Sequence, residues 1–406
     1  MTIDYRRTTC RACGSFDLSS VLNLGPQPPA NAFLKPDEFA SEQSFPLEVF
    51  FCRSCTLLQL LHIVSPDLLF RNYVYVSSTS PVFRSHFEGF ADQIMERYLK
   101  PGQRVVDIGS NDGILLAPLK ARGASVLGVD PATDIAKRAT QAGIPTLSHF
   151  FTPIVARVIK AKFGSAQVIT ANNVFAHTDD TNGFLAGVRE LLIPDGVFIV
   201  EVAYLMNFLD QRLFDTVYHE HVAYYSVRSL EALVQTAGFH VVDVELVSSH
   251  GGSIRATIAM DGRTPKASVA EFLAKEQERG LDREETYHNF AGLIEQNKQE
   301  LTDLLQKLRN DGKRIVGYGA PAKGNTLLNY MGIDHQMLDY IVDDSVFKQG
   351  LFTPGMHIPV AGFDRLAAHH PDYILILAWN FADAIIDKCR AIGSKFIIPV
   401  PTPTIQ

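Results

Sequence analysis

The chain has 406 residues, of which 46% are hydrophobic and 20% charged, a composition typical of a globular protein with two or three domains. Its formal net charge of −7 argues against a nucleic-acid partner, because phosphate binding normally needs a basic face. No apolar run approaches the roughly 20 residues of a membrane span. Residues 1–7 lack the apolar core of a signal peptide, so we expect a cytoplasmic protein without membrane contact.

Four of the five cysteines form two Cys-x-x-Cys pairs near the amino end. Four thiolates can complete a tetrahedron around zinc and leave no open position for a catalytic water, so we predict a structural zinc site. Its ligands are Cys10, Cys13, Cys52 and Cys55. The spacing between the pairs exceeds that of a zinc ribbon and predicts a looped insertion over residues 26–46.

The cysteine pairs have two other interpretations. Redox-active dithiols would need one pair at the start of a helix beside a sheet. A nucleic-acid-binding zinc ribbon would need a basic stripe, which the acidic and apolar sequence around residues 45–49 does not supply. After the second pair, tyrosines and hydroxyl residues at 73–80 predict a strand and a helix N-cap, and residues 83–99 carry helical periodicity.

An apolar strand over residues 104–108 leads into the pattern Asp107-x-Gly109-x-x-x-Gly113, after which a helical pattern begins. Strand, glycine turn and helix form a ligand crevice at the carboxyl edge of an open parallel sheet. A second strand over residues 125–129 ends at Asp130, which can accept hydrogen bonds from two ribose hydroxyls. The spacing is not that of a dinucleotide fingerprint, so these residues predict a nucleoside ligand without a pyrophosphate.

The α/β alternation continues to about residue 258 and implies parallel βαβ units. Asn172, Asn173 and His177 follow the strand at 168–170, so we place them on the same crevice edge as Asp107. A helix over residues 230–238 with a glycine cap is predicted next. Two strands, at 241–245 and 251–258, then suit an antiparallel edge hairpin.

Residues 266–311 are rich in Glu, Lys, Gln and Leu, and their apolar residues fall at helical spacing, so we predict an amphipathic connector helix. A second strand, glycine turn and helix follows at 313–325 and contains Gly319, Lys323 and Asn325. Backbone amides in such a turn favour an anion such as phosphate, and Lys323 can add a positive charge. This turn is therefore a candidate nucleotide-diphosphate site, and a purely structural turn is the alternative.

The densest run of titratable side chains is Tyr218-His219-Glu220-His221. Metal binding is one interpretation, but the run lacks the helical His spacing of zinc hydrolases. Buried core histidines are another, although a buried glutamate between two histidines is costly. General acid–base chemistry is the third and the one we favour, because imidazole titrates near neutral pH.

The turn at Asp107 resembles the first motif of class I S-adenosylmethionine-dependent methyltransferases. Together with the cysteine pairs, Asn172-Asn173, Tyr218-His219-Glu220-His221 and the turn at Gly319, it makes the whole chain similar to the sugar C-methyltransferases of branched-deoxysugar biosynthesis. These are the NDP-4-keto-deoxysugar 3-C-methyltransferases of the tetronitrose type. The resemblance implies an α/β fold with an N-terminal zinc domain, a Rossmann-like methyltransferase core and a smaller Rossmann-like C-terminal domain.

The resemblance also implies site roles. His221 is the base, Tyr218, Glu220 and His177 surround the sugar, and either Tyr73 or Tyr75 closes over it. The methyl donor is held by Asp107, Gly109, Ser110, Asn111, Gly113, Asp130, Asn172 and Asn173. The nucleotide of an NDP-sugar docks at Gly319, Lys323 and Asn325. Ser110 stands where some relatives have cysteine.

We predict four regions: a zinc domain at 1–72, a donor-binding core at 73–262, a helical connector at 263–312 and a docking domain at 313–406. The reaction expected is methyl transfer to a sugar carbon, C3, after removal of a proton next to the ketone. The rival functions are O- or N-methylation of another small metabolite, and sugar-nucleotide binding without catalysis. The choice between a monomer and a homo-oligomer stays open.

Overall fold

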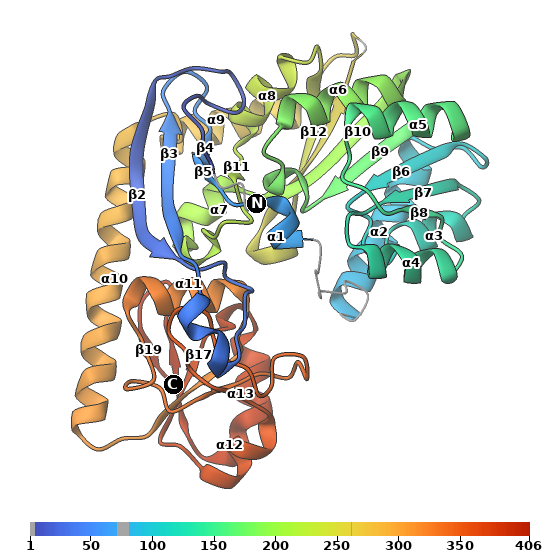
Figure 1. Cartoon of the computed structure of the whole chain (residues 1–406). Coiled ribbons are helices and arrows are strands. Elements are labelled where there is room, and N and C mark those ends of the chain that lie inside the picture. The colour runs from blue at the N-terminus through green and yellow to red at the C-terminus, as the bar shows by residue number, and fades with distance from the viewer. Residues whose placement is uncertain (1–4, 71–80, 261) are drawn as a thin grey trace.

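The structure is a computed structural model and describes residues 5–70, 81–260 and 262–406. Over these ranges the strands form three larger sheets and one two-stranded pair. The carboxy-terminal sheet lies apart from the other two, and the long helix α10 runs along both parts (Figure 1). Tyr73, Tyr75 and the strand predicted around them lie outside the described residues. No helix of the described chain is long and apolar enough to cross a membrane.

The amino-terminal sheet is antiparallel, with strand order β11-β4-β3-β2. Its strands are β2 (Leu18–Gln27), β3 (Phe45–Cys52), β4 (Leu58–Leu60) and β11 (Ala223–Tyr224). Strand β11 comes from the middle of the chain, so the segment directly after His221 is built into this sheet. Beside it, β1 (Tyr5–Arg6) pairs with β5 (His62–Ile63), and α1 (Pro66–Phe70) follows.

The predicted insertion between the cysteine pairs connects β2 to β3 and contains the short helix η1 (Pro36–Ser41). It reaches the carboxy-terminal domain, where Leu34 forms an isolated β-bridge with Phe352. The Glu42 carboxylate accepts hydrogen bonds from the amide of Gly355 and from the ring of His357, each at 2.8 Å. The insertion therefore ties the first part of the chain to the last.

The central sheet has seven strands in the order β12-β13-β10-β9-β6-β7-β8. Strands β6 to β10 are parallel, as predicted, and β12 with β13 forms the predicted antiparallel hairpin at the edge. The strands are β6 (Arg104–Ile108), β7 (Ser125–Val129), β8 (Thr146–Leu147), β9 (Ala166–Asn172), β10 (Leu192–Ala203), β12 (His240–Val247) and β13 (Ser253–Ala259). The hairpin folds back so that β13 lies between β10 and β12.

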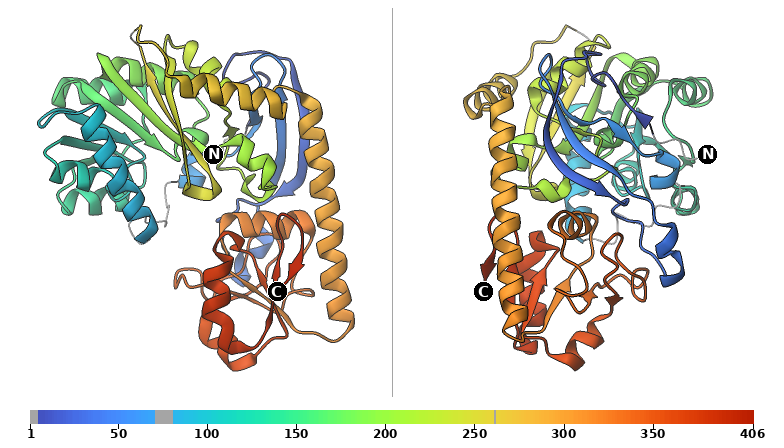
Figure 2. Two further views of the ribbon diagram at one scale, coloured as in Figure 1. Left: turned by 180° about the vertical axis from the view of Figure 1, so that it is seen from behind. Right: turned by 60° about the vertical axis from the view of Figure 1, so that its left-hand side comes forward.

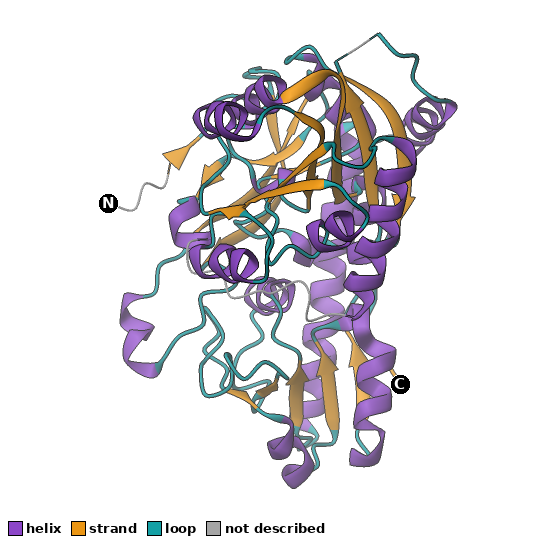
Figure 3. Cartoon of the chain, turned by 90° about the vertical axis from the view of Figure 1, so that its right-hand side faces the viewer, coloured by secondary structure: helices purple, strands orange, loops and turns teal. Residues whose placement is uncertain are grey.

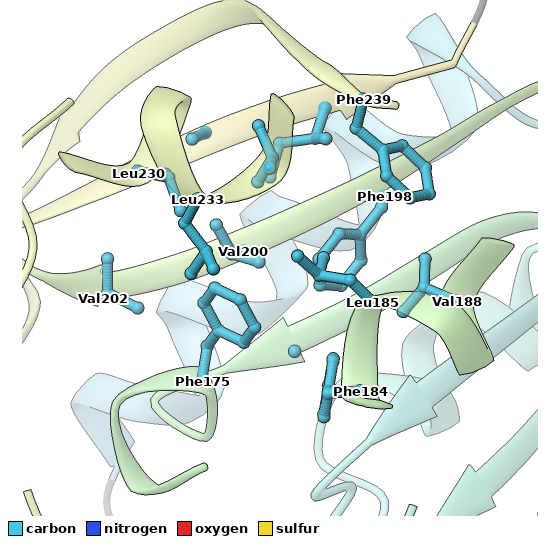
Figure 4. Close-up of a cluster of buried hydrophobic side chains, with 14 of the residues drawn as sticks. Phe175, Phe184, Leu185, Val188, Phe198, Val200, Val202, Leu230, Leu233 and Phe239 are labelled. Atoms are coloured by element: carbon cyan, nitrogen blue, oxygen red, sulfur yellow. The ribbon is translucent and has the colours of Figure 1, made fainter. Parts of the chain in front are cut away.

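Helices cover both faces of this sheet, because side chains alternate along each strand. On β10, Phe198 and Val200 pack against α6 and α8 on one face (Figure 4), whereas Val197 and Ile199 belong to the opposite cluster with α2 and α3. The helices are α2 (Pro81–Arg97), α3 (Leu116–Ala121), α4 (Thr133–Gln141), α5 (Pro153–Phe163), α6 (Thr181–Leu191), α7 (Leu205–Asp210) and α8 (Val227–Gln235), with η3 (Phe175–His177), η4 (Phe214–Thr216) and η5 (Ser249–Gly251).

The predicted connector is two helices rather than one, α9 (Ala267–Arg279) and α10 (Glu284–Asn310). Gly280 ends α9 in the left-handed conformation at φ +77°, which favours glycine as a helix stop. The predicted apolar stripe lies on α10, where Phe290, Ile294 and Leu301 are buried. Both views of Figure 2 show α10 running from beside the amino-terminal sheet to beside the carboxy-terminal domain.

The carboxy-terminal sheet has the order β16-β15-β14-β17-β18-β19, parallel except for β19. Its elements are β14 (Ile315–Tyr318), α11 (Ala322–Met331), β15 (Ile341–Val342), β16 (Val360–Ala361), α12 (Phe363–His369), β17 (Tyr373–Ile376), η6 (Trp379–Phe381), α13 (Ala382–Cys389), η7 (Arg390–Ile392), β18 (Lys395–Ile398) and β19 (Thr404–Ile405). The switch in strand order beside β14 is where such a sheet opens a ligand crevice. Figure 3 shows its strands as a group below the strands of the other sheets. The predicted fold class, with two Rossmann-like units behind a cysteine-bearing domain, is confirmed.

Candidate active site

The glycine turn after β6 has the geometry of a ligand turn. Gly109 has φ +70°, and its amide donates to the carbonyl of Val129 at 2.7 Å. A Cβ at Gly109 would lie 2.1 Å from Cγ2 of Val174, so both conformation and space require glycine. Gly113, at φ +85°, is similarly enclosed by Ile144. The turn therefore brings bare backbone to the carboxyl edge of the sheet.

Asp130 lies at the end of β7 and is almost fully buried. One carboxylate oxygen accepts from the amide of Asn111 at 2.8 Å and the other from that of Ala132 at 2.9 Å. Burial raises the pKa of Asp130, while these two amides oppose the rise. Because each carboxylate oxygen has a second lone pair, the group can still accept hydrogen bonds from a ligand. This fits the ribose contact predicted for it.

The Asp107 carboxylate is held by two residues of the neighbouring strand β9. It accepts a hydrogen bond from the hydroxyl of Thr170 at 2.6 Å and one from the side-chain amide of Asn172 at 3.4 Å. Burial raises the pKa of Asp107 to about 7, and the charge of Asp130 adds to the rise. Asn173 has φ +55° and donates its amide to the carbonyl of Glu201 at 2.8 Å.

Two polar atoms at this edge, Oγ of Ser110 and Oδ1 of Asn172, are buried and have no hydrogen-bond partner among the described residues. Both residues line the same cleft as Asp107 and Asp130. Buried polar atoms normally have partners, so unpaired ones in a cleft wall fit a polar ligand. A nucleoside methyl donor supplies such groups.

Within the described part of the chain, two hydrogen bonds hold His221 in the turn before β11. Its Nδ1 lies 2.8 Å from the carbonyl oxygen of Thr216, and its Nε2 lies 2.9 Å from the phenol oxygen of Tyr218. A carbonyl can only accept, so Nδ1 carries the proton in the neutral ring and Nε2 carries the lone pair. The Tyr218 phenol then donates to Nε2. This is the tautomer of a general base whose reactive atom is Nε2.

His177 and Glu220 complete the cluster. The His177 ring lies 4.9 Å from the His221 ring, and its Nδ1 donates to the Glu220 carbonyl oxygen at 2.6 Å. The Glu220 side chain is buried, and its carboxyl oxygen accepts a hydrogen bond from the side-chain amide of Asn31 at 2.8 Å. Burial raises the pKa of Glu220 to about 7. The structure thus brings Tyr218, Glu220, His177 and His221 together, and adds Asn31.

Asn31 could not be predicted from the sequence, because its partner lies 189 residues away. It belongs to the insertion after β2, whose proline-rich start was the one local sign of a fixed loop. His219, between Tyr218 and Glu220, is buried toward the amino-terminal sheet, where its Nε2 lies 3.2 Å from the Phe45 carbonyl oxygen. Burial lowers the pKa of His219 to about 4, so this histidine is a neutral core residue.

The four cysteines converge as predicted. Their sulfurs all lie within 4.8 Å of one another, and the Sγ atoms of Cys10 and Cys55 are 3.5 Å apart. Tetrahedral zinc with bonds of about 2.3 Å needs sulfurs roughly 3.8 Å apart, so the cluster fits the ion. The Gln59 amide donates to the sulfur of Cys10 at 3.1 Å. Within the described ranges this is the one group of His, Cys, Asp and Glu side chains placed to hold a metal.

The first cysteine knuckle also supports the loop that follows His177. Arg11, inside the knuckle, is fully buried and pairs with Asp179 at 3.1 Å. Arg7 pairs with the same carboxylate oxygen at 3.0 Å. The hydroxyl of Thr181 donates to the Arg11 carbonyl oxygen at 3.1 Å. The zinc domain is therefore packed directly against the segment that carries His177.

The glycine turn after β14 repeats the design of the first turn. Gly319 has φ +85° and donates its amide to Val342, as Gly109 does to Val129. Asp343 accepts from the amides of Ala320 at 2.7 Å and Ser345 at 2.8 Å, as Asp130 does in its own turn.

Two lysines face this second turn. Lys323 lies 4.1 Å from the centre of the Trp379 ring, and Lys348 donates to the Ala320 carbonyl oxygen at 2.8 Å. Burial lowers the pKa of both lysines. Lys348 was not predicted, because no glycine motif surrounds it. Asn325, predicted at the docking site, is instead buried on α11 and donates to the Ala30 carbonyl oxygen at 2.7 Å.

One cleft of about 2140 Å³ connects the two turns and the histidine cluster. Its walls include Asp107 and Asp130 of the first turn, His177 and His221 of the cluster, and Lys323 of the second turn. Gly113, Gly319 and Asn325 do not line it. The two turns and the histidine cluster therefore share one cleft.

Three family models match the chain in order. They are "Putative zinc binding domain" at residues 10–70, "Methyltransferase domain" at 83–244 and "C-methyltransferase C-terminal domain" at 248–401. The first contains the four cysteines, and the second contains both the turn at Gly109 and the cluster around His221. The third contains the turn at Gly319 and its lysines.

C-methyltransferase NovU of Streptomyces niveus is 40% identical over 98% of this chain and 96% of its own. A ubiquinone biosynthesis O-methyltransferase of Psychrobacter arcticus is 27% identical over 35% of this chain and 61% of its own. Among solved structures, magnesium protoporphyrin IX methyltransferase of Synechocystis PCC 6803, with bound S-adenosylmethionine, matches 43% of this chain and 79% of its own. Its identity is 16% and its TM-score 0.32.

The near full-length relative and the three ordered domains decide the family. The donor of the methyltransferase domain is S-adenosylmethionine, and the four-cysteine cluster is a structural zinc site. The chain belongs to the S-adenosylmethionine-dependent C-methyltransferases, enzymes that transfer a methyl group to carbon.

Proposed function

We propose that this C-methyltransferase acts on a nucleotide-linked 4-keto-deoxysugar and methylates the carbon next to the ketone, C3. The observation that carries the proposal is the shared cleft, which is lined by His221, by the donor turn at Gly109 and by Lys323 of the last domain. A carbon nucleophile needs a base and a donor to its enolate oxygen, and the cluster offers both.

The chain's own residues account for the proton transfer. Nε2 of neutral His221 has the lone pair that takes the proton from the sugar carbon, and the Thr216 carbonyl stabilises the resulting imidazolium through Nδ1. The Tyr218 phenol, which gives up its hydrogen bond to Nε2 when the sugar carbon approaches, is the donor to the enolate oxygen, and the His177 ring lies beside His221. S-adenosylmethionine, when bound, supplies an electrophilic methyl group, so no metal is needed for activation.

The last domain suits the nucleotide part of the substrate. Lys323 lies in the first turn of α11, where backbone amides and the helix dipole favour phosphate, and Lys348 adds a second charge. Val346, Phe347 and Phe381 are exposed on the cleft rim and offer apolar surface to a nucleobase. Asn325 supports this site indirectly, through its hydrogen bond to Ala30.

We also propose the division of labour that the sequence predicts. Residues 1–72 hold zinc, 73–262 bind the methyl donor, 263–312 connect the parts, and 313–406 dock the nucleotide. Strand β11 qualifies this division, because it lies in the middle region and pairs with β4 of the first.

The proposal is tested by incubating the enzyme with S-adenosylmethionine and a panel of TDP-, GDP- and CDP-linked 4-keto-deoxysugars. Mass spectrometry should show a gain of one methyl group for at least one of them. In D₂O without S-adenosylmethionine, the wild type should exchange the C3 proton and His221→Asn should not. Methylation or exchange that persists in His221→Asn would contradict the role of His221.

A further inference from the structure

The segment η4, just before the histidine cluster, is packed on the last domain. The buried ring of Phe214 meets the ring of Tyr330 on α11 edge to face, with centroids 5.5 Å apart. The Arg212 guanidinium donates to the Pro401 carbonyl oxygen at 3.1 Å. Figure 1 shows α11 facing α7, the helix that leads into η4. The position of η4 therefore depends on the last domain as well as on its own.

Asp215, in the middle of η4, is completely buried. Its Oδ2 accepts a hydrogen bond from Nε1 of Trp379 at 2.6 Å, whereas its Oδ1 makes no hydrogen bond with the described residues. The Lys323 ammonium lies over the same Trp379 ring. Burial raises the pKa of Asp215 to about 6, and the charge of Lys323 opposes the rise. Since a buried carboxylate is costly unless well paired, packing alone does not explain it.

The residue after Asp215 holds the base. The Thr216 carbonyl accepts the Nδ1 proton of His221, so the backbone of η4 sets both the tautomer and the direction of the imidazole. A continuous set of contacts thus runs from Lys323 through Trp379 and Asp215 to His221. The negative charge of an anion bound at Lys323 offsets the positive charge that the ammonium exerts on the Asp215 carboxylate.

We propose that Asp215 is a positioning residue that couples anion binding at Lys323 to the alignment of His221. The inference rests on the proposed docking of a nucleotide diphosphate in the last domain. It adds that docking there adjusts the base about which the methyl transfer is organised. The enzyme would then remove the sugar proton efficiently only when the nucleotide is in place, which protects the methyl donor from unproductive reaction.

The experiment uses the full-length zinc-loaded protein and two signals. Trp379 is the single tryptophan of the chain, so its fluorescence reports binding of TDP, GDP or CDP in the last domain. The ¹⁵N resonances of the His221 ring, assigned with His221→Gln, report the position of the base. In the wild type, a saturating nucleotide should change both signals.

Asp215→Asn keeps the shape and the acceptor for Trp379 but removes the charge. It should bind the nucleotide with a Kd within about threefold of wild type, yet the His221 resonances should no longer respond. Its kcat on the keto-sugar should fall roughly tenfold or more, with an unchanged KM for S-adenosylmethionine. Asp210→Asn, an exposed carboxylate five residues earlier paired with Arg279, should behave as wild type. If Asp215→Asn does not fold, Trp379→Phe takes its place, and calorimetry then measures the nucleotide Kd. Its His221 resonances should likewise fail to respond to the nucleotide.

Different results contradict the docking site and its coupling to His221. If none of the three nucleotides binds the wild type, the proposed docking site is wrong, and the coupling with it. If a nucleotide binds but the His221 resonances do not move, or move equally in Asp215→Asn, docking stands and the coupling is wrong.

Discussion

The buried carboxylate of Glu220 accepts a hydrogen bond from Asn31, a residue of the insertion between the two cysteine pairs. The residue before Asn31, Ala30, accepts a hydrogen bond through its carbonyl oxygen from the side-chain amide of Asn325 on α11. The first and last domains thus meet at residues 30 and 31, next to Glu220 of the histidine cluster.

Tyr218→Phe removes the phenol that donates to Nε2 of His221 and leaves the ring in place. We expect kcat for methyl transfer to fall roughly tenfold to a hundredfold, because an enolate donor is lost, while the Kd for S-adenosylmethionine stays within about twofold. Steady-state kinetics and calorimetry measure the two quantities. Tyr340→Phe, a phenol outside the cleft, is the control, and equal losses in both variants would contradict the role of Tyr218.

Each carboxylate oxygen of Asp130 accepts a hydrogen bond from a backbone amide. Asp130→Asn replaces one of these oxygens with an NH₂ group, which can only donate. Since hydrogen bonds to a charged group are worth about 1.5–3 kcal/mol, the Kd for S-adenosylmethionine should rise roughly tenfold or more. Calorimetry on the zinc-loaded protein checks this. Asp134→Asn, exposed on the next helix, should bind as wild type, and an unaffected Asp130→Asn would remove Asp130 from the donor site.

Zinc should be present at one ion per chain when measured by mass spectrometry of the purified protein. Cys52→Ser should lose it and unfold at a lower temperature, because the knuckles and the Arg11–Asp179 contact depend on the cluster. Cys389→Ala, at the buried cysteine outside the cluster, should keep the ion. Zinc retained by Cys52→Ser would contradict the ligand assignment.

Glu220→Gln should change how stability depends on pH. Burial raises the pKa of Glu220 from 4.5 to about 7, so the folded chain holds this proton more tightly than the unfolded chain. The resulting stabilisation is present below pH 4.5 and is lost as the pH rises to about 7. The stability of the variant relative to wild type should therefore rise between pH 5 and pH 8, by roughly 1–3 kcal/mol. Urea unfolding at both pH values measures it, with exposed Glu285→Gln showing no such trend.

The sequence predicts the parts of this protein that local chemistry determines. Strand and glycine turn around Gly109 and Gly319, the hairpin after α8 and the convergence of the cysteines all follow from patterns within short segments. The prediction of a single connector helix was wrong, because Gly280 ends α9 and a second helix, α10, follows. One glycine inside a charged, helix-rich stretch does not by itself predict a break.

The contacts between domains could not be predicted, because their partners are far apart along the chain and carry no shared motif. Asn31 with Glu220, and Asp215 with Trp379, are examples. Asn325 shows the converse, since the family resemblance implied a contact with the nucleotide, but its helix turns the side-chain amide toward Ala30. Helix periodicity fixes which face a residue occupies, and only the neighbouring domain decides what that face meets.

The most direct test of the account is the covalent structure of the product made with S-adenosylmethionine labelled with ¹³C in its methyl group. For the NDP-4-keto-deoxysugar that the enzyme accepts, two-dimensional NMR should place the labelled methyl on C3, with long-range correlations to the neighbouring ring carbons. His221→Asn should yield none of this product. A labelled methyl found on oxygen or nitrogen, or a C-methylated product still formed by His221→Asn, would contradict the account.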